Sequence, residues 1–303
     1  MGNAPIFNPT GGIDAPVAWH YGDPLGEQRR LAAGVGSVDL SHRSVLRLAG
    51  ADRLDFLNSL TTQKLLGLPS GESALTLNLN PQGFVLHELR VYALAEELLI
   101  TSEPGTADEL CAYFNQMRFR AKVAIEDASA EYAAVWSLTA SSAEVPVWRS
   151  PFPGGGVEQL VRRDALVEWM ATEPAGTWAY EALRVAAGIP RCGFETDHHT
   201  LPHEVGWIAS AVHLNKGCYR GQETVSKVER MGQPPRLLVT LLLDGSEDLP
   251  ATGDEVFIGE KSVGRIGTAA QHYELGPIAF ALVKRASAEE ATFLVGGKPA
   301  ARL

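Results

Sequence analysis

The spacing of apolar residues between positions 44 and 126 changes repeatedly between two and about 3.6. These are the periods at which side chains recur on one face of a strand and of a helix. The changes occur at turn-forming residues and give the order strand, helix, two strands, helix, strand, which resembles a split β-α-β unit. The chain is therefore predicted to be an α+β protein.

Turn signals and apolar positions set the boundaries of the first elements. We expect a strand over residues 44–49 and a helix that begins near Asp52. Two further strands, over residues 74–79 and 85–92, are joined by Asn-Pro-Gln-Gly at 80–83. This tetrapeptide supplies a fixed φ and a residue that tolerates positive φ, so it predicts a tight hairpin.

Two later helices have their own signals. Thr106 and Glu109 form a capping-box pattern, and apolar residues follow on one face. Another helix is predicted over residues 177–187, where Gly188 and Pro190 act as stop signals.

Prolines and glycines divide the chain into larger parts. Residues 141–156 contain three prolines and a run of three glycines, so we expect no regular structure there. We place the junction of two interleaved α/β domains near this stretch, within a region covering residues 1–235. From residue 236 to 303 short apolar runs alternate with glycines, which indicates a C-terminal domain that is a small antiparallel β-barrel or sandwich.

Composition restricts the classes of function. The formal net charge is −10 without a long basic run, so no nucleic-acid partner is expected. The sequence shows neither a signal-peptide pattern nor a run of about 20 apolar residues, so we expect no export and no membrane association. Cys111, Cys192 and Cys218 are three widely separated thiols, which indicates reduced cysteines and a cytoplasmic location.

The segment with the most unusual composition is Lys216-Gly217-Cys218-Tyr219-Arg220-Gly221-Gln222-Glu223. Cysteine reacts as a thiolate, and the neighbouring cations Lys216 and Arg220 would favour that form. Cys218 is therefore the candidate reactive group. The alternative is a small buried hydrophobic residue, as we expect for Cys111 and Cys192.

A polar cluster at positions 197–204 offers several metal-ligand types, but its spacing fits neither a His-x-x-x-His pair nor a Cys-x-x-Cys knuckle. No metal site is predicted. Glu204 has a second candidate role, because a carboxylate can accept two hydrogen bonds from the edge of an aminopyrimidine. The alternative for Glu204 is a solvent-exposed acid. The five residues of the cluster are Asp197, His198, His199, His203 and Glu204.

The segment from Lys216 to Glu223 resembles the Lys-Gly-Cys-Tyr/Phe-x-Gly-Gln-Glu signature of the YgfZ family, within the glycine-cleavage T-protein superfamily. Supporting similarity covers nearly the whole chain. It includes residues 38–42, 50–57, 180–190 and 264–267.

This resemblance implies a cloverleaf of three domains around a central channel that holds tetrahydrofolate or a one-carbon derivative. It also implies a role in the assembly or repair of iron–sulfur clusters. Glu204 matches the T-protein glutamate that binds the pterin ring, whereas the T-protein aspartate pair is replaced by His87 and Glu88. Ala186 replaces a glutamate that is often present in relatives.

The predicted site therefore consists of seven residues. Cys218 and Lys216 are the candidate catalytic residues, and five others are expected to bind folate: Glu204, Tyr219, Asn80, His87 and Glu88. The expected partners are folate and iron–sulfur enzymes or assembly factors. Two alternatives are a glycine-cleavage aminomethyltransferase and a folate-binding scaffold without catalysis.

Overall fold

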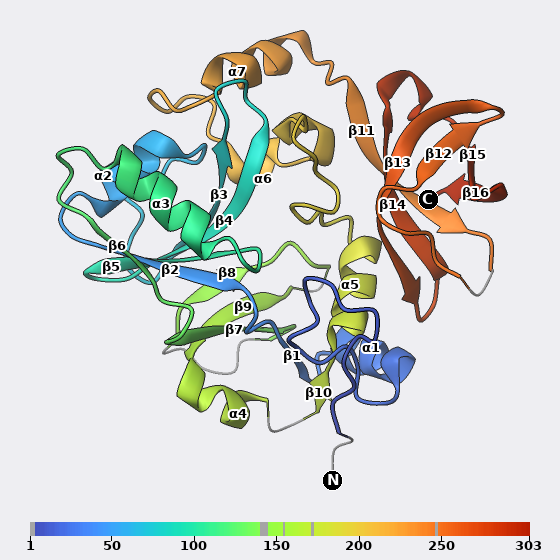
Figure 1. Cartoon of the computed structure of the whole chain (residues 1–303), viewed down its shortest axis with the longest axis horizontal. Helices are drawn as coiled ribbons and strands as arrows, with labels where there is room; N and C mark the ends of the chain where they lie inside the picture. Colours follow the sequence, from blue (N-terminus) through green and yellow to red (C-terminus); the bar gives the residue numbers. More distant parts are fainter. Residues whose placement is uncertain (1–3, 140–144, 154, 171–172, 246–247) are drawn as a thin grey trace.

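The computed structural model describes residues 4–139, 145–153, 155–170, 173–245 and 248–303. The chain forms two five-stranded sheets and a closed barrel, and these three parts meet around helix α5 (Thr177–Ala186) (Figure 1). The predicted α+β architecture of three parts is confirmed. Within the described residues, no helix has the length and apolar character needed to cross a membrane.

The first sheet has the strand order β3-β4-β5-β2-β6 and is covered on one face by two helices. Leu57 of α2 and Phe114 of α3 pack with Leu48, Leu89 and Ile100 of the sheet in one buried cluster. The elements are β2 (Ser44–Ala49), α2 (Arg53–Leu60), β3 (Ser73–Leu79), β4 (Val85–Ala93), β5 (Glu97–Ser102), α3 (Ala107–Met117) and β6 (Ala124–Asp127).

Two features of this sheet differ from the prediction. Strand β5 was not expected, because it lies inside the sheet with buried residues on both faces, so its sequence does not alternate. The capping box of α3 is also absent. The Thr106 hydroxyl donates to the Glu103 carbonyl (2.7 Å) instead, and Glu109 lies 3.7 Å from His87.

The second sheet has the order β10-β1-β7-β9-β8. The prediction that residues 141–156 lack regular structure is wrong at β8, which pairs with β9. This stretch connects two strands of one sheet, and its residues 141–144 and 154 lie outside the described residues. The elements are β1 (Ser37–Asp39), β7 (Tyr132–Ser137), β8 (Val147–Arg149), β9 (Val157–Arg162), η1 (Arg163–Ala165), α4 (Leu166–Trp169) and β10 (Pro174–Ala175).

The C-terminal barrel is confirmed as a closed antiparallel barrel of six strands, in the order β11-β14-β13-β12-β15-β16. Its interior is filled mainly by small and β-branched residues together with Phe293. The elements are β11 (Arg236–Leu243), β12 (Glu255–Ile258), β13 (Lys261–His272), β14 (Gly276–Lys284), η3 (Arg285–Ser287), β15 (Thr292–Val295) and β16 (Lys298–Arg302).

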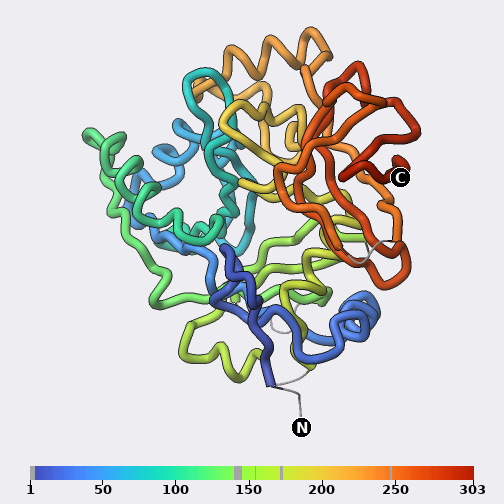
Figure 2. The backbone as a smooth tube through the Cα atoms, turned by 45° about the vertical axis from the view of Figure 1, so that its right-hand side comes forward, coloured from blue at the N-terminus to red at the C-terminus, as the bar shows by residue number. Residues whose placement is uncertain are grey.

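The remaining helices join these parts. Helix α5 begins at the predicted Thr177 and packs on β13 and β14 of the barrel. Helix α1 (Pro24–Ala32) lies beneath the barrel (Figure 2), and Gln28 exchanges two hydrogen bonds of 2.9 Å with the backbone of Gln271 and Tyr273. Three helices follow α5 in the chain and precede the first barrel strand: η2 (Pro202–Val205), α6 (Ile208–Ala211) and α7 (Gln222–Met231).

Buried ion pairs connect all three parts. Arg191 donates to Asp14 (2.7 and 2.8 Å), Glu103 (2.9 Å) and Glu181 (3.3 Å). Arg184 binds Glu181 and Glu195, and Glu195 accepts the backbone N–H of Thr268 in the barrel (2.7 Å). The network contains four arginines and six carboxylates: Arg43, Arg90, Arg184 and Arg191 with Asp14, Glu88, Glu103, Glu158, Glu181 and Glu195.

We expect Arg191→Leu to lower the free energy of unfolding by about 3–5 kcal/mol, because it leaves buried carboxylates without their cation. Arg302→Leu serves as the control, since its partner Glu289 is 88% exposed, and should change stability by less than about 0.5 kcal/mol. Urea denaturation of both variants measures the difference. Equal small losses would show that the buried network does not hold the parts together.

Candidate functional site

The unusual segment from Lys216 to Glu223 forms the turn that leads into α7, and its glycines differ in role. Gly221 has a φ of +80°, and a Cβ there would lie 2.7 Å from the Cα of Gly83 and 2.8 Å from the Asn80 carbonyl oxygen. The β3–β4 hairpin tip is therefore in direct backbone contact with the segment. By contrast, a Cβ on Gly217 would meet nothing within 4 Å.

The Lys216 ammonium is bound at the C-terminal end of α2. Its ammonium donates to the carbonyl oxygens of Asn58 (2.5 Å), Thr61 (2.7 Å) and Gln63 (2.6 Å), which lie at and beyond the helix C-terminus. Such carbonyls have no partner within the helix and attract a cation. Burial lowers the pKa of Lys216 to about 8. The geometry thus gives Lys216 a positioning role, so a direct effect on the Cys218 thiol remains a prediction.

Cys218 is exposed, whereas Cys192 is buried and Cys111 is half-buried, and all three are free thiols. Burial raises the pKa of Cys192 to about 12 and also raises the pKa of Cys111. This placement agrees with the expectation that Cys218 is accessible and that Cys111 and Cys192 pack like small hydrophobic residues. The reactivity of Cys218 stays a prediction.

Tyr219, the next residue, points inward. Its ring packs in the main core and lies 5.4 Å from the Lys216 ammonium. Its hydroxyl has no hydrogen-bond partner among the described residues, and burial raises its pKa to about 12. A buried phenol without a partner is a polar group that a ligand could satisfy.

Glu204 is buried, and not the exposed acid of the alternative reading. It stands in η2 and accepts the N–H of Leu201 (2.8 Å). Arg236, the first residue of the barrel, donates to both of its oxygens (2.9 Å each) and also to Asp197 (2.7 Å). Burial opposes ionisation of Asp197, but the bonds from Arg236 outweigh it and lower the pKa of Asp197.

Glu204 therefore has little acceptor capacity left. Its three hydrogen bonds leave one lone-pair direction on Oε1, since each carboxylate oxygen accepts about two. For both Glu204 oxygens to bind a pterin edge, Arg236 would have to release Glu204. Arg236 could then turn toward Asp197, to which it already donates a hydrogen bond.

Asn80 holds the hairpin turn. Its side-chain oxygen accepts the N–H groups of Gln82 (3.0 Å) and Phe84 (2.9 Å), as in other turns stabilised by asparagine. Only its amide nitrogen remains for a ligand, so the predicted folate contact is confined to that group.

His87 and Glu88 leave strand β4 on opposite faces. His87 lies 3.4 Å from Asn78 and 3.7 Å from Glu109 of α3. Glu88 lies on the other face, 3.2 Å from Arg90. A ligand on one face therefore reaches only one of the two, although both were predicted to bind folate.

Of these two residues, Glu88 has the more unusual surroundings. Its second carboxylate oxygen is buried without a hydrogen-bond partner among the described residues. Burial raises the pKa of Glu88, although Arg90 and Arg43 act in the opposite direction. A carboxyl group in this state can donate or accept a proton. Burial also lowers the pKa of His87, with partial opposition from Glu109.

Several residues that shape this region were not predicted from the sequence. Arg236, Arg191 and Glu158 are isolated charges in the chain, and only the fold brings their partners close. The Pro234-Pro235 pair directly before Arg236 was the available signal, because it fixes the start of the barrel next to η2.

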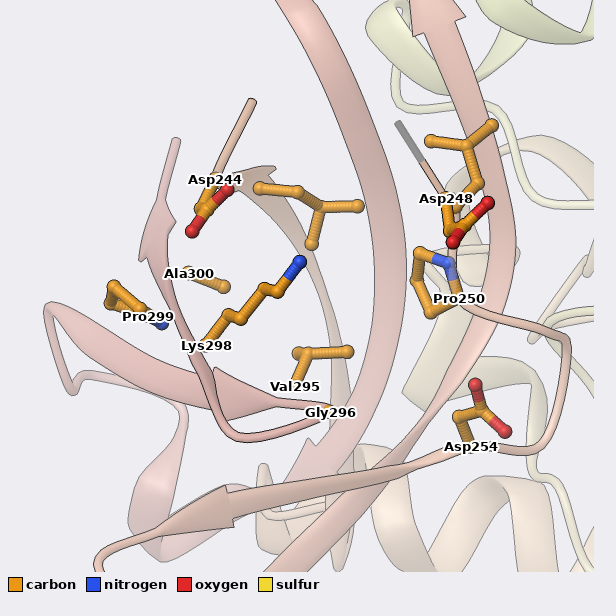
Figure 3. Close-up of a pocket in the computed structure, with 11 residues that line it drawn as sticks. Asp244, Asp248, Pro250, Asp254, Val295, Gly296, Lys298, Pro299 and Ala300 are labelled. Atoms are coloured by element: carbon orange, nitrogen blue, oxygen red, sulfur yellow. The ribbon is translucent and has the colours of Figure 1, made fainter. Parts of the chain in front are cut away.

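Two hollows lie away from these residues. One, of about 230 Å³, lies at the end of the barrel, where Lys298 extends between Asp244 on one side and Asp248 and Asp254 on the other (Figure 3). Another, of about 240 Å³, lies between the N-terminal segment, α5 and the barrel. Within the described part of the chain, no group of three histidine, cysteine or acidic residues could hold a metal ion.

Comparison with known proteins defines the fold first. A glycine cleavage system aminomethyltransferase T from Bartonella henselae superposes with a TM-score of 0.81, covering 95% of this chain and 90% of that chain at 19% identity. The chain thus has the three-part fold of a glycine-cleavage T-protein.

Sequence comparison then narrows the class. Residues 6–138 match the GCVT N-terminal domain. An aminomethyltransferase of Xanthomonas axonopodis pv. citri is 26% identical, covering 95% of this chain and 88% of the relative. One of Streptomyces avermitilis is 25% identical, with 94% and 87% covered. These matches support the T-protein (aminomethyltransferase) superfamily for this chain.

We expect Gly221→Ala to lower the free energy of unfolding by more than about 1 kcal/mol, because alanine is strained at positive φ and would contact Gly83. Gly217→Ala, in the same turn, should change it by less than about 0.5 kcal/mol. Thermal denaturation of the two variants compares them. The close approach of hairpin and turn would be contradicted if both variants were equally stable.

Alkylation with iodoacetamide at neutral pH should modify Cys218 first, since Cys192 and Cys111 are shielded and have raised pKa values. Mass spectrometry of tryptic peptides identifies the labelled site, and Cys218→Ser should abolish the fast phase. Rapid labelling of Cys192 would mean that its surroundings open readily in solution.

Proposed function

We propose that this protein binds tetrahydrofolate or a one-carbon derivative, with Cys218 as a reactive thiol, and acts in the assembly or repair of iron–sulfur clusters in the cytoplasm. The T-protein fold is the observation that carries the folate part of the proposal. The resemblance of the Lys216 to Glu223 segment to the YgfZ signature supports the iron–sulfur part.

The chain offers buried polar groups for such a ligand. The Tyr219 hydroxyl and one Glu88 oxygen are buried and lack partners among the described residues. Folate presents amino, amide and ring N–H donors and ring acceptors, so it can satisfy groups of this kind. The free direction on Glu204 Oε1 supplies one further acceptor. When bound, the folate would carry a one-carbon unit.

The residues also support a division of roles. Gly221 and Lys216 fix the two ends of the turn, so Cys218 is presented on a rigid element while its side chain remains accessible. A positioned, exposed thiol can attack an electrophile or form an adduct once it loses its proton. In this proposal Lys216 contributes by holding the turn that positions Cys218.

An aminomethyltransferase remains the second candidate, and Glu88 is the observation that favours it. Its buried carboxyl, with a raised pKa and one free oxygen, could exchange a proton with a folate nitrogen. The change from an aspartate pair to His87 and Glu88, on opposite faces of β4, disfavours it.

Calorimetric titration with tetrahydrofolate tests the folate site. We expect Glu204→Gln to weaken binding at least about tenfold, since it removes a charged acceptor and disturbs Arg236. Glu229→Gln is the matched control, because Glu229 is exposed and its carboxylate lies 3.4 Å from His203. Absence of binding in the unmodified protein would refute the folate proposal.

Cys218→Ala separates the two candidates. If the proposal is right, this variant binds tetrahydrofolate normally but fails to restore the activity of iron–sulfur enzymes in cells that lack the protein. An aminomethyltransferase would instead transfer a one-carbon unit from a lipoyl protein to tetrahydrofolate, and Glu88→Gln would abolish that transfer. Full cellular function in Cys218→Ala would exclude a reactive thiol.

A further inference from the structure

A pocket of about 340 Å³ lies between three segments that do not include any of the predicted site residues. These are the turn that precedes β2, the N-terminus of α3, and the region where Asp127 and Ser129 approach Arg163. Its lining contains three basic side chains, His42, Arg43 and Arg163, in a chain whose net charge is −10. Such a local concentration of basic side chains calls for a specific explanation.

Arg163 is a rigid cation without an acidic partner among the described residues. Its guanidinium donates to the carbonyl oxygens of Ser129 (2.8 Å), Ser41 (2.7 Å) and Tyr132 (3.2 Å). These bonds use Nε and one Nη, so the other Nη nitrogen has no partner in the part of the chain that the structure describes. Because the group is already held in place, binding an anion would cost it little rotamer entropy.

His42 and Arg43 are buried and incompletely paired. Only 2% of the His42 side chain is exposed; its Nε2 lies 2.7 Å from Asp14, while its Nδ1 has no partner among the described residues. The Arg43 side chain is 3% exposed, its Nε has no hydrogen-bond partner among the described residues, and its guanidinium lies 3.7 Å from Glu158 and 3.9 Å from Glu103. Buried donors are normally satisfied, so two such side chains lining one pocket indicate a missing acceptor.

The N-terminus of α3 adds donors of the same kind. This helix has 11 residues and no side-chain cap, because the Thr106 hydroxyl donates backward to Glu103. The first N–H groups of the helix therefore have no side-chain cap among the residues that the structure describes, and the helix dipole favours an anion there. Ser44 fixes the approach by accepting the N–H of Thr106 (3.0 Å).

Two acids also line the pocket, but they occupy its rim. Asp108 and Asp127 are both exposed, and the Asp127 carboxylate accepts the N–H of Ser129 (2.8 Å). Exposed carboxylates are screened by water and repel an anion only weakly, whereas the buried donors act at short range. The balance favours an oxyanion at the base of the pocket.

We propose that this pocket binds an oxyanion, a phosphate or carboxylate group of a small ligand, through Arg163, Arg43, His42 and the N-terminus of α3. The site is separate from the proposed folate site and does not depend on it. The oxyanion supplies the acceptors that His42 Nδ1, Arg43 and the free Arg163 nitrogen lack.

Calorimetric titration of the full chain with inorganic phosphate, at constant ionic strength maintained with chloride, tests the proposal. A parallel titration with acetate distinguishes a phosphate from a carboxylate ligand. We expect saturable binding of at least one of the two anions. Amide chemical shifts of residues 41–44 and 105–108 should move as the same anion is added. Failure of both anions to bind would overturn the proposal.

A matched pair of aspartates provides variants that leave the fold intact. Asp108 lies in the first turn of α3 at the pocket, and Asp55 lies in the first turn of α2, outside it; both are exposed. Asp108→Asn should tighten anion binding about threefold, because a repulsive charge at the rim is removed. Asp55→Asn should leave it unchanged. The same effect from both variants would mean that the anion responds only to net charge, and the site would be refuted.

Arg163→Gln provides the opposite change. It removes the fixed cation and should reduce the affinity at least about tenfold. Should this variant lose its fold, because Arg163 also ties three backbone carbonyls, the gain of affinity in Asp108→Asn still decides the question. Unchanged affinity in a folded Arg163→Gln protein would place the anion elsewhere and contradict the proposal.

Discussion

The buried ion network around Arg191 is the constraint on which the arrangement of the three parts depends. Arg191 binds Asp14 from the N-terminal segment, Glu103 from the first sheet and Glu181 from α5. Removing charges from water is costly, so each ion stays buried only while its partners are in place. The network has two more carboxylates than arginines, and burial raises the pKa of Glu88, which reduces this excess when Glu88 is protonated. The relative placement of the parts is thus set by charge pairing as well as by apolar packing.

Elements that depend on local pattern were predictable, and those that depend on distant partners were not. The strand at 44–49, the hairpin at 80–83 and the antiparallel strands after residue 236 follow from apolar period and turn residues, whereas the choice of a closed barrel over a sandwich does not. Strand β5 was not predicted, because a strand that is buried on both faces loses the alternation of apolar and polar residues. Arg191 and Asp14 are separated by 177 positions, so nothing near either residue signals the other.

The segment from Lys216 to Glu223 has several structural roles, although its sequence suggested a single chemical role. Crowded cations and glycines suggested a single reactive centre at Cys218. In the structure Lys216 closes the end of α2, Gly221 admits the backbone of Gly83, and Tyr219 enters the core. Cys218 is exposed, as are Gly217 and Glu223. Glu204 likewise matches the expected position, but its pairing with Arg236 of the barrel could not be foreseen from either residue.

The two hydrogen bonds between Gln28 and the backbone of residues 271 and 273 join helix α1 to a hairpin that follows it by more than 240 positions in the chain. Helix α1 leaves the ribosome long before this hairpin is synthesised, so its final docking must wait until the hairpin has emerged. Contacts of such long range slow folding and leave surfaces uncovered during synthesis. The nascent chain of this protein is therefore expected to need protection until the barrel has emerged and packed against helix α1.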